Sequence, residues 1–405
     1  MKTEKFEFTG HDGSTLAARL ELPMGKPQAT AIFAHCFTCS KDIPAAKRIS
    51  QRLAAQGIAV LRFDFTGLGH SAGEFSNTHF SSNVEDLINA SAALAEKIAA
   101  PSLLVGHSLG GAAVIKAACE LPSVKAVATI GAPHDPEHVI HNFGASIEEI
   151  ETEGEAEVSL AGRPFNIKKT FLEDVRASSL DACLATMKRA LLVLHSPIDA
   201  TVGIENAAAI FAAAKHPKSF VTLDKADHLV TEAADAAYVA EVIGSWATRY
   251  LDLHPDLHAR PEDSVIRSTE LDPDAFLQLI QSDVIATYAD EPKSYGGSDV
   301  GLTPFEFVSA GLAACTSMTI RMYARHKKLP LESVEVDVVH DKVHATECEN
   351  CETTEGKVDQ FQRRITLLGD LDEATRIRLL QIADKCPVHK TLHGEVNVQT
   401  ELVEA

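Results

Sequence analysis

Residues 102–120 read SLLVGHSLGGAAVIKAACE, and this stretch decides the fold of the N-terminal half. An apolar strand pattern, SLLV, runs into Gly106-His107-Ser108-Leu109-Gly110, and an apolar helix pattern follows. Glycines two positions before and after the serine allow a tight turn that exposes the hydroxyl group. A glycine-rich βα turn that arose by chance is the alternative. The strand and helix on either side favour a serine nucleophile at Ser108.

A serine hydroxyl needs a histidine base, which a carboxylate orients in turn. Asp199 follows the apolar strand pattern ALLVLH, and His228 follows the pattern SFVTL. Because loops at the carboxyl ends of parallel strands meet at one edge of a sheet, we expect Ser108, Asp199 and His228 to form a triad. Asp227 is a rival acid, but it would have to fold back onto its neighbour His228, so we favour Asp199.

The segments around this site predict an α/β sheet. From residue 30 to residue 223, short apolar β-branched runs alternate with helical patterns, which is typical of a mostly parallel sheet. Two alternating segments before them, KFEF and TLAARLEL, predict an antiparallel hairpin. The rhythm stops over residues 133–188, where an acidic stretch precedes GRPFNIKKTF. We interpret this segment as an inserted cap, with a solvated surface excursion as the alternative.

With these motifs, residues 1–250 resemble the α/β-hydrolase superfamily. The stretch DFTGLGHS at residues 64–71 matches that family's structural D-x-x-G-x-G-x-S loop. The resemblance implies an oxyanion hole formed by the backbone N–H groups of Leu109 and Phe37. Phe37 lies in a stretch, HCFT, where the family usually has a His-Gly pair. The resemblance also implies a serine hydrolase that acts on small-molecule carboxylic esters through an acyl-enzyme, without a cofactor.

Other residues in this half invite functional interpretations that we do not favour. Cys36 and Cys39 form a C-x-x-C, but the sequence offers no second ligand pair nearby, so packing is favoured over metal binding. His70, His79 and His107 are interpreted as loop and packing residues.

The C-terminal part predicts a second domain of another class. Prolines and polar residues interrupt the pattern over residues 251–262, as in a linker, and residues 263–405 lack the βαβα rhythm. We expect an α+β domain with three short strands, a long helix from Pro304 to Leu329, two more strands, a helix from Asp372 to Asp384, and a final strand over residues 394–403.

Two cysteine motifs carry a second resemblance. Cys315 lies in GLTPFEFVSAGLAACTSMTIRMYA and Cys386 in DKCPVHKTL; with an ADEP segment and a Gly-Gly turn, they resemble the OsmC and organic-hydroperoxide-resistance family. The resemblance implies that Cys315 attacks an organic hydroperoxide, that Cys386 resolves the sulfenic acid, and that a thiol reductant completes the cycle. It also implies a homodimer formed through this domain. Glu306 lies near the family's acidic position and is a candidate supporting residue, while Phe305 takes the place of its glutamate.

A further cluster, His340, His344, Cys348 and Cys351, has a spacing that permits zinc, but exposed hairpin residues or a redox pair are favoured, and we expect no metal site. The formal charge of −20 disfavours nucleic-acid binding. The sequence shows no signal-peptide pattern and no apolar stretch long enough to span a membrane, so we expect a cytoplasmic protein.

The leading hypothesis is therefore an esterase fused to a thiol-dependent hydroperoxide reductase. One alternative makes the C-terminal domain a non-catalytic dimerisation or ligand-binding module that serves the esterase. Another makes the whole chain a stress-linked binding protein with a degenerate hydrolase site, which the intact triad order disfavours.

Overall fold

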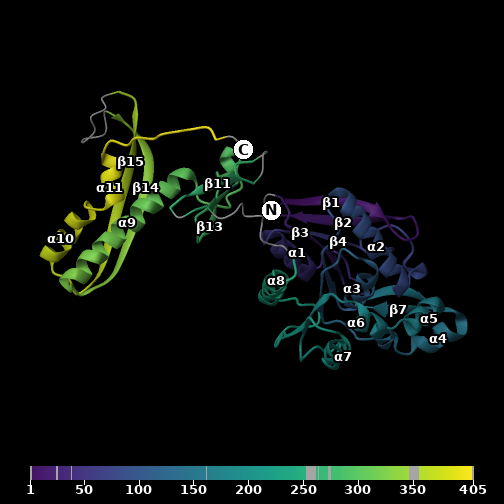
Figure 1. Ribbon diagram of the computed structural model, residues 1–405. Coiled ribbons are helices and arrows are strands. Elements are labelled where there is room, and N and C mark those ends of the chain that lie inside the picture. Colours follow the sequence, from purple (N-terminus) through teal and green to yellow (C-terminus); the bar gives the residue numbers. More distant parts are fainter. Residues whose placement is uncertain are drawn as a thin grey trace. The chain divides into compact units, whose positions relative to one another are not determined.

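The computed structural model describes residues 2–23, 26–37, 39–160, 162–251, 261–262, 264–271, 275–345 and 355–403. The chain divides into two compact units, Met1–Ala259 and Arg260–Ala405. The first is an α/β unit with a mixed sheet, and the second is an α+β unit (Figure 1). The linker predicted over residues 251–262 lies almost wholly outside the described residues and stays a prediction.

An eight-stranded sheet organises the first unit, in the order β1-β2-β4-β3-β5-β6-β9-β10. The leading hairpin pairs antiparallel and joins β4 antiparallel, whereas all strands from β4 to β10 run parallel. The strands are β1 (Lys2–Thr9), β2 (Thr15–Leu22), β3 (Ala29–Ala34), β4 (Ile58–Phe63), β5 (Leu103–His107), β6 (Ala126–Ile130), β9 (Ala190–His195) and β10 (Lys218–Thr222). The predicted hairpin and parallel strands lie where the sequence patterns place them, within a few residues.

Helices cover both faces of this sheet, because the side chains of each strand alternate between its faces. In β3, Ala31 and Phe33 join a core with α1 (Pro44–Ala55) and α8 (Ala233–Ala247). Ile32 and Ala34 join the opposite core with α2 (Phe80–Lys97), α3 (Leu109–Glu120) and α7 (Glu205–Ala213). Burial on both faces explains why these central strands read as continuous apolar runs.

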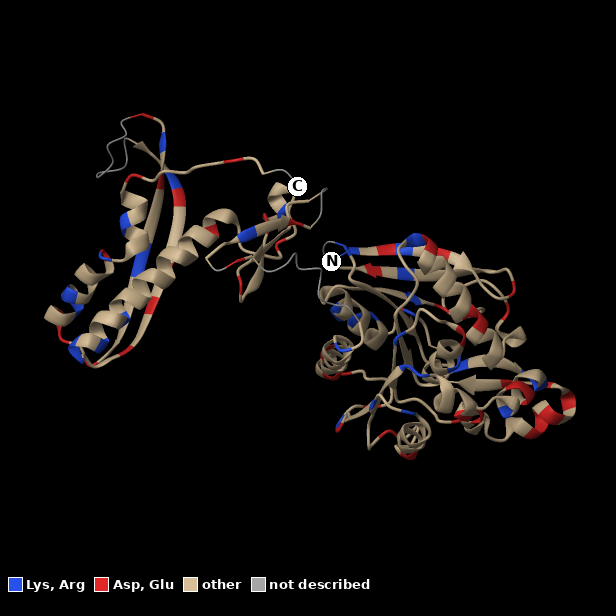
Figure 2. Ribbon diagram, viewed as in Figure 1, with Lys and Arg blue, Asp and Glu red and all other residues tan. Residues whose placement is uncertain are grey.

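The segment predicted as a cap is a folded insertion between β6 and β9. It contains the 3₁₀ helix η2 (Pro136–Phe143), α4 (Ser146–Glu153), the hairpin of β7 (Glu155–Leu160) and β8 (Arg163–Lys168), α5 (Lys169–Ala177) and α6 (Asp181–Thr186). Its buried side chains, among them Ile150, Val158 and Phe171, join the core that holds α3. Acidic side chains gather on α4 (Figure 2). The insertion therefore packs onto the sheet domain and turns its charged side outward.

In the second unit, α9 (Pro304–Lys327) packs on the hairpin of β14 (Leu331–His344) and β15 (Lys357–Gly369), with α10 (Glu373–Ala383) beside it. A small sheet of β11 (Arg267–Glu270), β12 (Gln278–Gln281) and β13 (Ala286–Ala289) and the 3₁₀ helix η3 (Lys293–Tyr295) precede α9. Thr303 and Glu306 form a capping box at the start of α9: the Glu306 N–H donates to Thr303 Oγ1, and the Thr303 N–H donates to Glu306 Oε2. The box explains why the helix begins at Pro304.

The final strand predicted over residues 394–403 is wrong for this chain. Helix α11 (Pro387–His393) comes after Cys386, and residues 394–403 then form no strand. Val396 and Val398 are 58% and 81% exposed. Alternating residues form a strand only beside a neighbour that accepts their hydrogen bonds, and the described part of this unit gives them none.

Candidate active site

Ser108 occupies the turn between β5 and α3 in a strained conformation, with φ 55° and ψ −128°. Two glycines make this turn possible. A Cβ atom on Gly106 would lie 2.3 Å from the carbonyl oxygen of Gly110, and one on Gly110 would lie 2.4 Å from the carbonyl oxygen of His35. Strain of this kind persists only where the surrounding structure enforces it, and it is common at reactive residues.

The structure brings the three predicted residues into one hydrogen-bonded chain. Ser108 Oγ lies 3.0 Å from His228 Nε2, and His228 Nδ1 lies 2.7 Å from Asp199 Oδ2. The other carboxylate oxygen, Asp199 Oδ1, accepts the N–H groups of Thr201 and Val202 at 2.8 and 2.9 Å. This geometry is that of a nucleophile, a base and an orienting acid.

The Asp199 carboxylate is held in its ionised form. Burial by itself raises the pKa of Asp199, but the hydrogen bond with His228 and those from the Val202 and Thr201 N–H groups outweigh it and hold the pKa below its usual value. The rival acid, Asp227, instead accepts hydrogen bonds from the N–H and hydroxyl groups of Thr231.

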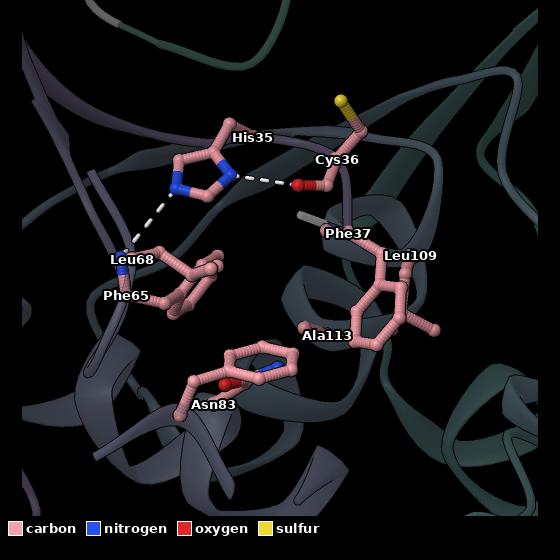
Figure 3. A pocket seen from close by; sticks show the side chains of 10 residues that line it. His35, Cys36, Phe37, Phe65, Leu68, Asn83, Leu109 and Ala113 are labelled. Carbon is pink, nitrogen blue, oxygen red and sulfur yellow. Dashed lines mark hydrogen bonds between the residues drawn. The ribbon is translucent and has the colours of Figure 1, made fainter. Parts of the chain in front are cut away.

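The loop after β3 presents the predicted oxyanion donor, Phe37. His35 Nδ1 lies 2.7 Å from the carbonyl oxygen of Cys36, and the Phe65 N–H lies 3.4 Å from His35 Nε2 (Figure 3). Burial lowers the pKa of His35, so its ring is neutral and donates from Nδ1. The Cys36 carbonyl and the Phe37 N–H belong to one planar peptide and point in opposite directions. His35 therefore aims the Phe37 N–H by holding the other side of the same peptide.

Phe37 and Leu109 line one small cavity of about 10 Å³ between the oxyanion loop and α3 (Figure 3). Within the described ranges, no hydrogen bond occupies the N–H group of either residue. Both donors are therefore available to an incoming oxygen.

Buried charges hold the far end of this loop. Asp64 accepts the Lys41 N–H at 2.5 Å and the Lys41 Nζ at 2.7 Å, and Arg62 donates to the Lys41 carbonyl oxygen at 2.6 Å. Arg62 also pairs with Glu21, and all four side chains are almost fully buried. Removing one partner of such a network leaves a charge uncompensated, so the network fixes the loop to β4.

In the second unit, the predicted cysteines lie side by side as free thiols. Cys386 is fully buried, whereas Cys315 is partly exposed. Burial and the hydrogen bond with Cys386 raise the pKa of Cys315. Burial also opposes ionisation at Cys386, but the hydrogen bond from Cys315 and the His389 N–H hold the pKa of Cys386 below its usual value.

The family models match both halves of the chain. A model described as serine aminopeptidase, S33, matches residues 25–152, and a model described as OsmC-like protein matches residues 296–401. A solved esterase domain from Rhodothermus marinus is 53% identical, covers 62% of this chain and 99% of its own, and has a TM-score of 0.53. This chain belongs to the α/β hydrolases and carries a C-terminal OsmC-like domain.

Two more distant structures share only the fold of the hydrolase unit. Est1E from Butyrivibrio proteoclasticus, solved with ferulic acid, is 22% identical with a TM-score of 0.50, and covers 60% of this chain and 98% of its own. A putative hydrolase from Agrobacterium vitis S4 is 20% identical with a TM-score of 0.53 and the same coverage. No curated protein matches the chain.

Two buried histidines, His107 and His195, hold the loops that carry His228 and Asp199. His107 Nε2 lies 2.6 Å from the carbonyl oxygen of His228, and His195 Nε2 lies 2.8 Å from that of Val202 in the Asp199 loop. Burial lowers the pKa of His107 to about 4, so its ring stays neutral beside His228. His107 therefore holds the loop that carries His228, which is the loop and packing role interpreted from the sequence.

His70 and His79, the other two histidines interpreted as loop and packing residues, also make structural contacts. His79 caps α2 by accepting the Ser82 N–H at 3.0 Å. The backbone N–H of His70 donates to Asp64, while the His70 side chain is largely exposed.

The sequence interpretation missed an aromatic cluster between the oxyanion loop and the cap. The Phe37 ring lies 5.4–6.3 Å, centroid to centroid, from Phe75, Phe143 and Phe171, and Phe165 adds an edge contact to Phe75. These five residues come from five different loops, strands and helices. The sequence shows only that all of them are phenylalanines, and this does not predict that their rings contact one another.

In the OsmC-like unit, the Glu306 side chain accepts the Thr303 N–H in the capping box of α9, and the ring of its neighbour Phe305 stacks on His340 at 4.2 Å between centroids. Sequence reasoning also missed Arg363, which donates to Thr316 Oγ1 at 3.1 Å and to Asp384 at 2.6 Å. Thr316 forms a hydrogen bond with Cys386, so Arg363 supports the cysteine pair through Thr316.

The four-residue cluster considered for zinc is only partly described. Cys348 and Cys351 lie outside the described residues, and His340 Nε2 lies 2.9 Å from Asp359 Oδ1. Among the residues whose placement is described, no group of three or more His, Cys, Asp or Glu could hold a metal. In that same part of the chain, none of the helices could cross a bilayer.

Proposed function

We propose that the hydrolase unit cleaves carboxylic esters through an acyl-enzyme on Ser108. The observation that carries the proposal is the Ser108, His228, Asp199 chain together with the N–H groups of Phe37 and Leu109, which have no hydrogen-bond partner among the described residues. The 53% identical esterase domain supports an ester as substrate.

The reaction follows from the geometry. Ser108 Oγ attacks the ester carbonyl while His228 Nε2 takes its proton, and Asp199 stabilises the imidazolium. The oxyanion accepts the Phe37 and Leu109 N–H groups, each of which contributes about 3 kcal/mol of transition-state stabilisation. The intermediate collapses as His228 returns the proton to the leaving alcohol. Water, activated by His228, then cleaves the acyl-serine, so that ester and water become acid and alcohol.

A fluorophosphonate probe tests this proposal. The probe is expected to label the wild type on Ser108 and to leave Ser108→Ala unlabelled, while the two proteins share the same thermal midpoint. A panel of p-nitrophenyl esters of increasing chain length then reports the acyl preference. A folded wild type that takes no label, beside a hydrolase control that does, would overturn the proposal.

For the OsmC-like unit we propose thiol-dependent reduction of organic hydroperoxides, carried by the adjacent Cys315 and Cys386 thiols. Cys315 loses its proton to solvent, and the Cys315 thiolate attacks the hydroperoxide, which with one proton from water gives an alcohol and a sulfenic acid. Cys386 then displaces water to form a disulfide, which two equivalents of a thiol reductant reopen. Cys315→Ser is expected to abolish hydroperoxide consumption, whereas Cys386→Ser leaves a single turnover.

The competing proposal for this unit is a non-catalytic dimerisation or ligand-binding module. In either case we propose a homodimer through the OsmC-like unit, because α9 exposes Met318 and Met322 by about 70% each. A cytoplasmic location remains our proposal. Light scattering on the full chain and on a chain ending at Tyr250 tests the dimer. If neither cysteine substitution affects hydroperoxide turnover while the truncation gives a monomer, the module proposal replaces the peroxidase one.

A further inference from the structure

Two cysteines enclose the oxyanion donor. Cys36 and Cys39 form a disulfide with 5.4 Å between their Cα atoms, and Phe37 lies between them in the sequence. The Cys36 sulfur points away from the cavity that Phe37 and Leu109 line (Figure 3). The disulfide therefore acts on the oxyanion loop through the backbone of Cys36 and Cys39.

The carbonyl group of Cys36 and the N–H group of Phe37 belong to the same planar peptide, so the position of Cys36 sets the direction of the Phe37 N–H. Besides the bond to His35, the Cys36 carbonyl oxygen accepts the Cys39 N–H at 3.2 Å. The disulfide closes this turn covalently across the same two residues. Reduction removes the covalent link and leaves the peptide held by hydrogen bonds alone.

We propose that Cys36 and Cys39 are a redox site that sets the activity of the esterase: the disulfide form holds the Phe37 N–H in place, and the dithiol form is the less active one. This inference rests on the oxyanion role of Phe37 in the proposed ester hydrolysis. The structure pairs the disulfide with a formed Ser108–His228 contact, which is the arrangement expected of the active form.

Exposure decides how the bond opens. Cys36 is buried at 3% exposure and Cys39 is half-buried, so an attacking thiolate reaches Cys39 Sγ and displaces the Cys36 thiolate. A second thiol then cleaves the mixed disulfide, which leaves the Cys36–Cys39 dithiol and an oxidised small disulfide. In the reverse direction the Cys39 thiolate takes an oxygen from an organic hydroperoxide to give a sulfenic acid and an alcohol. Cys36 then forms the disulfide and releases water.

This oxidant belongs to the class that we propose as substrate of the OsmC-like unit. The esterase would therefore be most active when hydroperoxides are present and would fall in activity as the thiol pool becomes reduced.

The chain offers an internal control. Cys119 at the end of α3 and Cys183 in α6 form a second disulfide, which links the hydrolase core to the cap but includes no residue of the oxyanion loop. Reduction opens both pairs, so Cys119→Ser/Cys183→Ser isolates the effect of the loop pair.

The experiment measures hydrolysis of p-nitrophenyl acetate by the full chain, with Ser108→Ala as the blank. The protein is assayed as the disulfide, after reduction with a phosphine that is then removed, and after re-oxidation with cumene hydroperoxide. Differential alkylation and peptide mapping report the state of each cysteine. Loss of one whole oxyanion donor lowers kcat by about 10²–10³. Because hydrogen bonds still hold the Cys36–Phe37 peptide, we expect a fall of about tenfold in kcat with KM unchanged, reversed by the hydroperoxide.

Variants complete the test. The kcat of Cys39→Ser is expected to equal that of the reduced wild type and to stay unchanged after treatment with the phosphine or the hydroperoxide. In Cys119→Ser/Cys183→Ser, kcat is expected to change with both reagents as in the wild type. The inference is overturned if the loop disulfide opens with no change in kcat, if KM alone changes, or if the hydroperoxide leaves Cys36 and Cys39 as thiols. Should Cys39→Ser fail to fold, the reduced wild type still decides. Activity in Ser108→Ala would instead overturn the ester-hydrolase proposal itself.

Discussion

Replacing Asp199 by Asn isolates the tautomer of the base. The bonds from Thr201 and Val202 both end on Asp199 Oδ1, so the Asn carbonyl keeps them, and the amide nitrogen takes the place of Oδ2, 2.7 Å from His228 Nδ1. An N–H donor there forces the imidazole proton onto Nε2, which then cannot accept the proton of Ser108. Loss of one ordinary hydrogen bond would cost about 1 kcal/mol. A wrong tautomer costs about 10⁴ in kcat, or about 5 kcal/mol of barrier.

The assay is kcat for p-nitrophenyl acetate at neutral pH, with the thermal midpoint as a check on folding. Asp227→Asn is the matched control, because it makes the same chemical change beside His228 at a carboxylate that binds Thr231. We expect a loss of about 10⁴ for Asp199→Asn and less than threefold for Asp227→Asn. A folded Asp199→Asn protein within tenfold of the wild type would refute the reasoning, as would equal losses in the two variants.

Three further predictions follow from neighbouring residues. In the folded chain the pKa of His107 is lowered from 6.5 to about 4, so the unfolded chain binds this proton first as the pH falls. The free energy of unfolding is therefore unaffected by this group above pH 6.5 and falls by about 3 kcal/mol between pH 6.5 and pH 4. Urea denaturation should show a smaller acid loss for His107→Gln, and an unchanged pH dependence would contradict this. A Cβ on Gly131 would lie 3.2 Å from Asp199 Oδ2 at φ 55°, so Gly131→Ala should lower kcat by roughly tenfold. Gly144→Ala, with similar φ and open space, should lower stability but spare kcat; equal kcat in both variants would exclude crowding as the cause. His35→Leu should lower kcat up to about 10² with KM kept, because the Cys36–Phe37 peptide loses its anchor, and a rise in KM alone would argue against that role.

The sequence carried the hydrolase fold and the candidate triad because both rest on local patterns. Burial on both faces made the central strands apolar runs, and parallel strands deliver their following loops to one edge. That rule brought Asp199 and His228 to Ser108 across 91 and 120 positions in the sequence. The His35 anchor and the Phe37 aromatic cluster escaped prediction because they depend on contacts between segments that carry no shared pattern.

The C-terminal error has a different cause. Residues 394–403 alternate as a strand does, yet alternation fixes only which side chains share a face, and the strand needs a partner that the described part of the unit does not supply. Helix α11 was missed because a helix of seven residues that begins with a proline is too short for a helical period to show. The pairing of Cys36 with Cys39 was likewise missed, since spacing alone does not separate packing from a disulfide.

Trapping the acyl-enzyme shows directly whether Ser108 is the nucleophile. Wild type is mixed with a slight excess of p-nitrophenyl acetate, quenched in acid at successive times and analysed by intact mass and peptide mapping. We expect a burst of nitrophenolate, with one acetyl group on the peptide that contains Ser108 and none in Ser108→Ala. Ester hydrolysis that persists in Ser108→Ala, or an acetyl group that appears only on another residue, would contradict it.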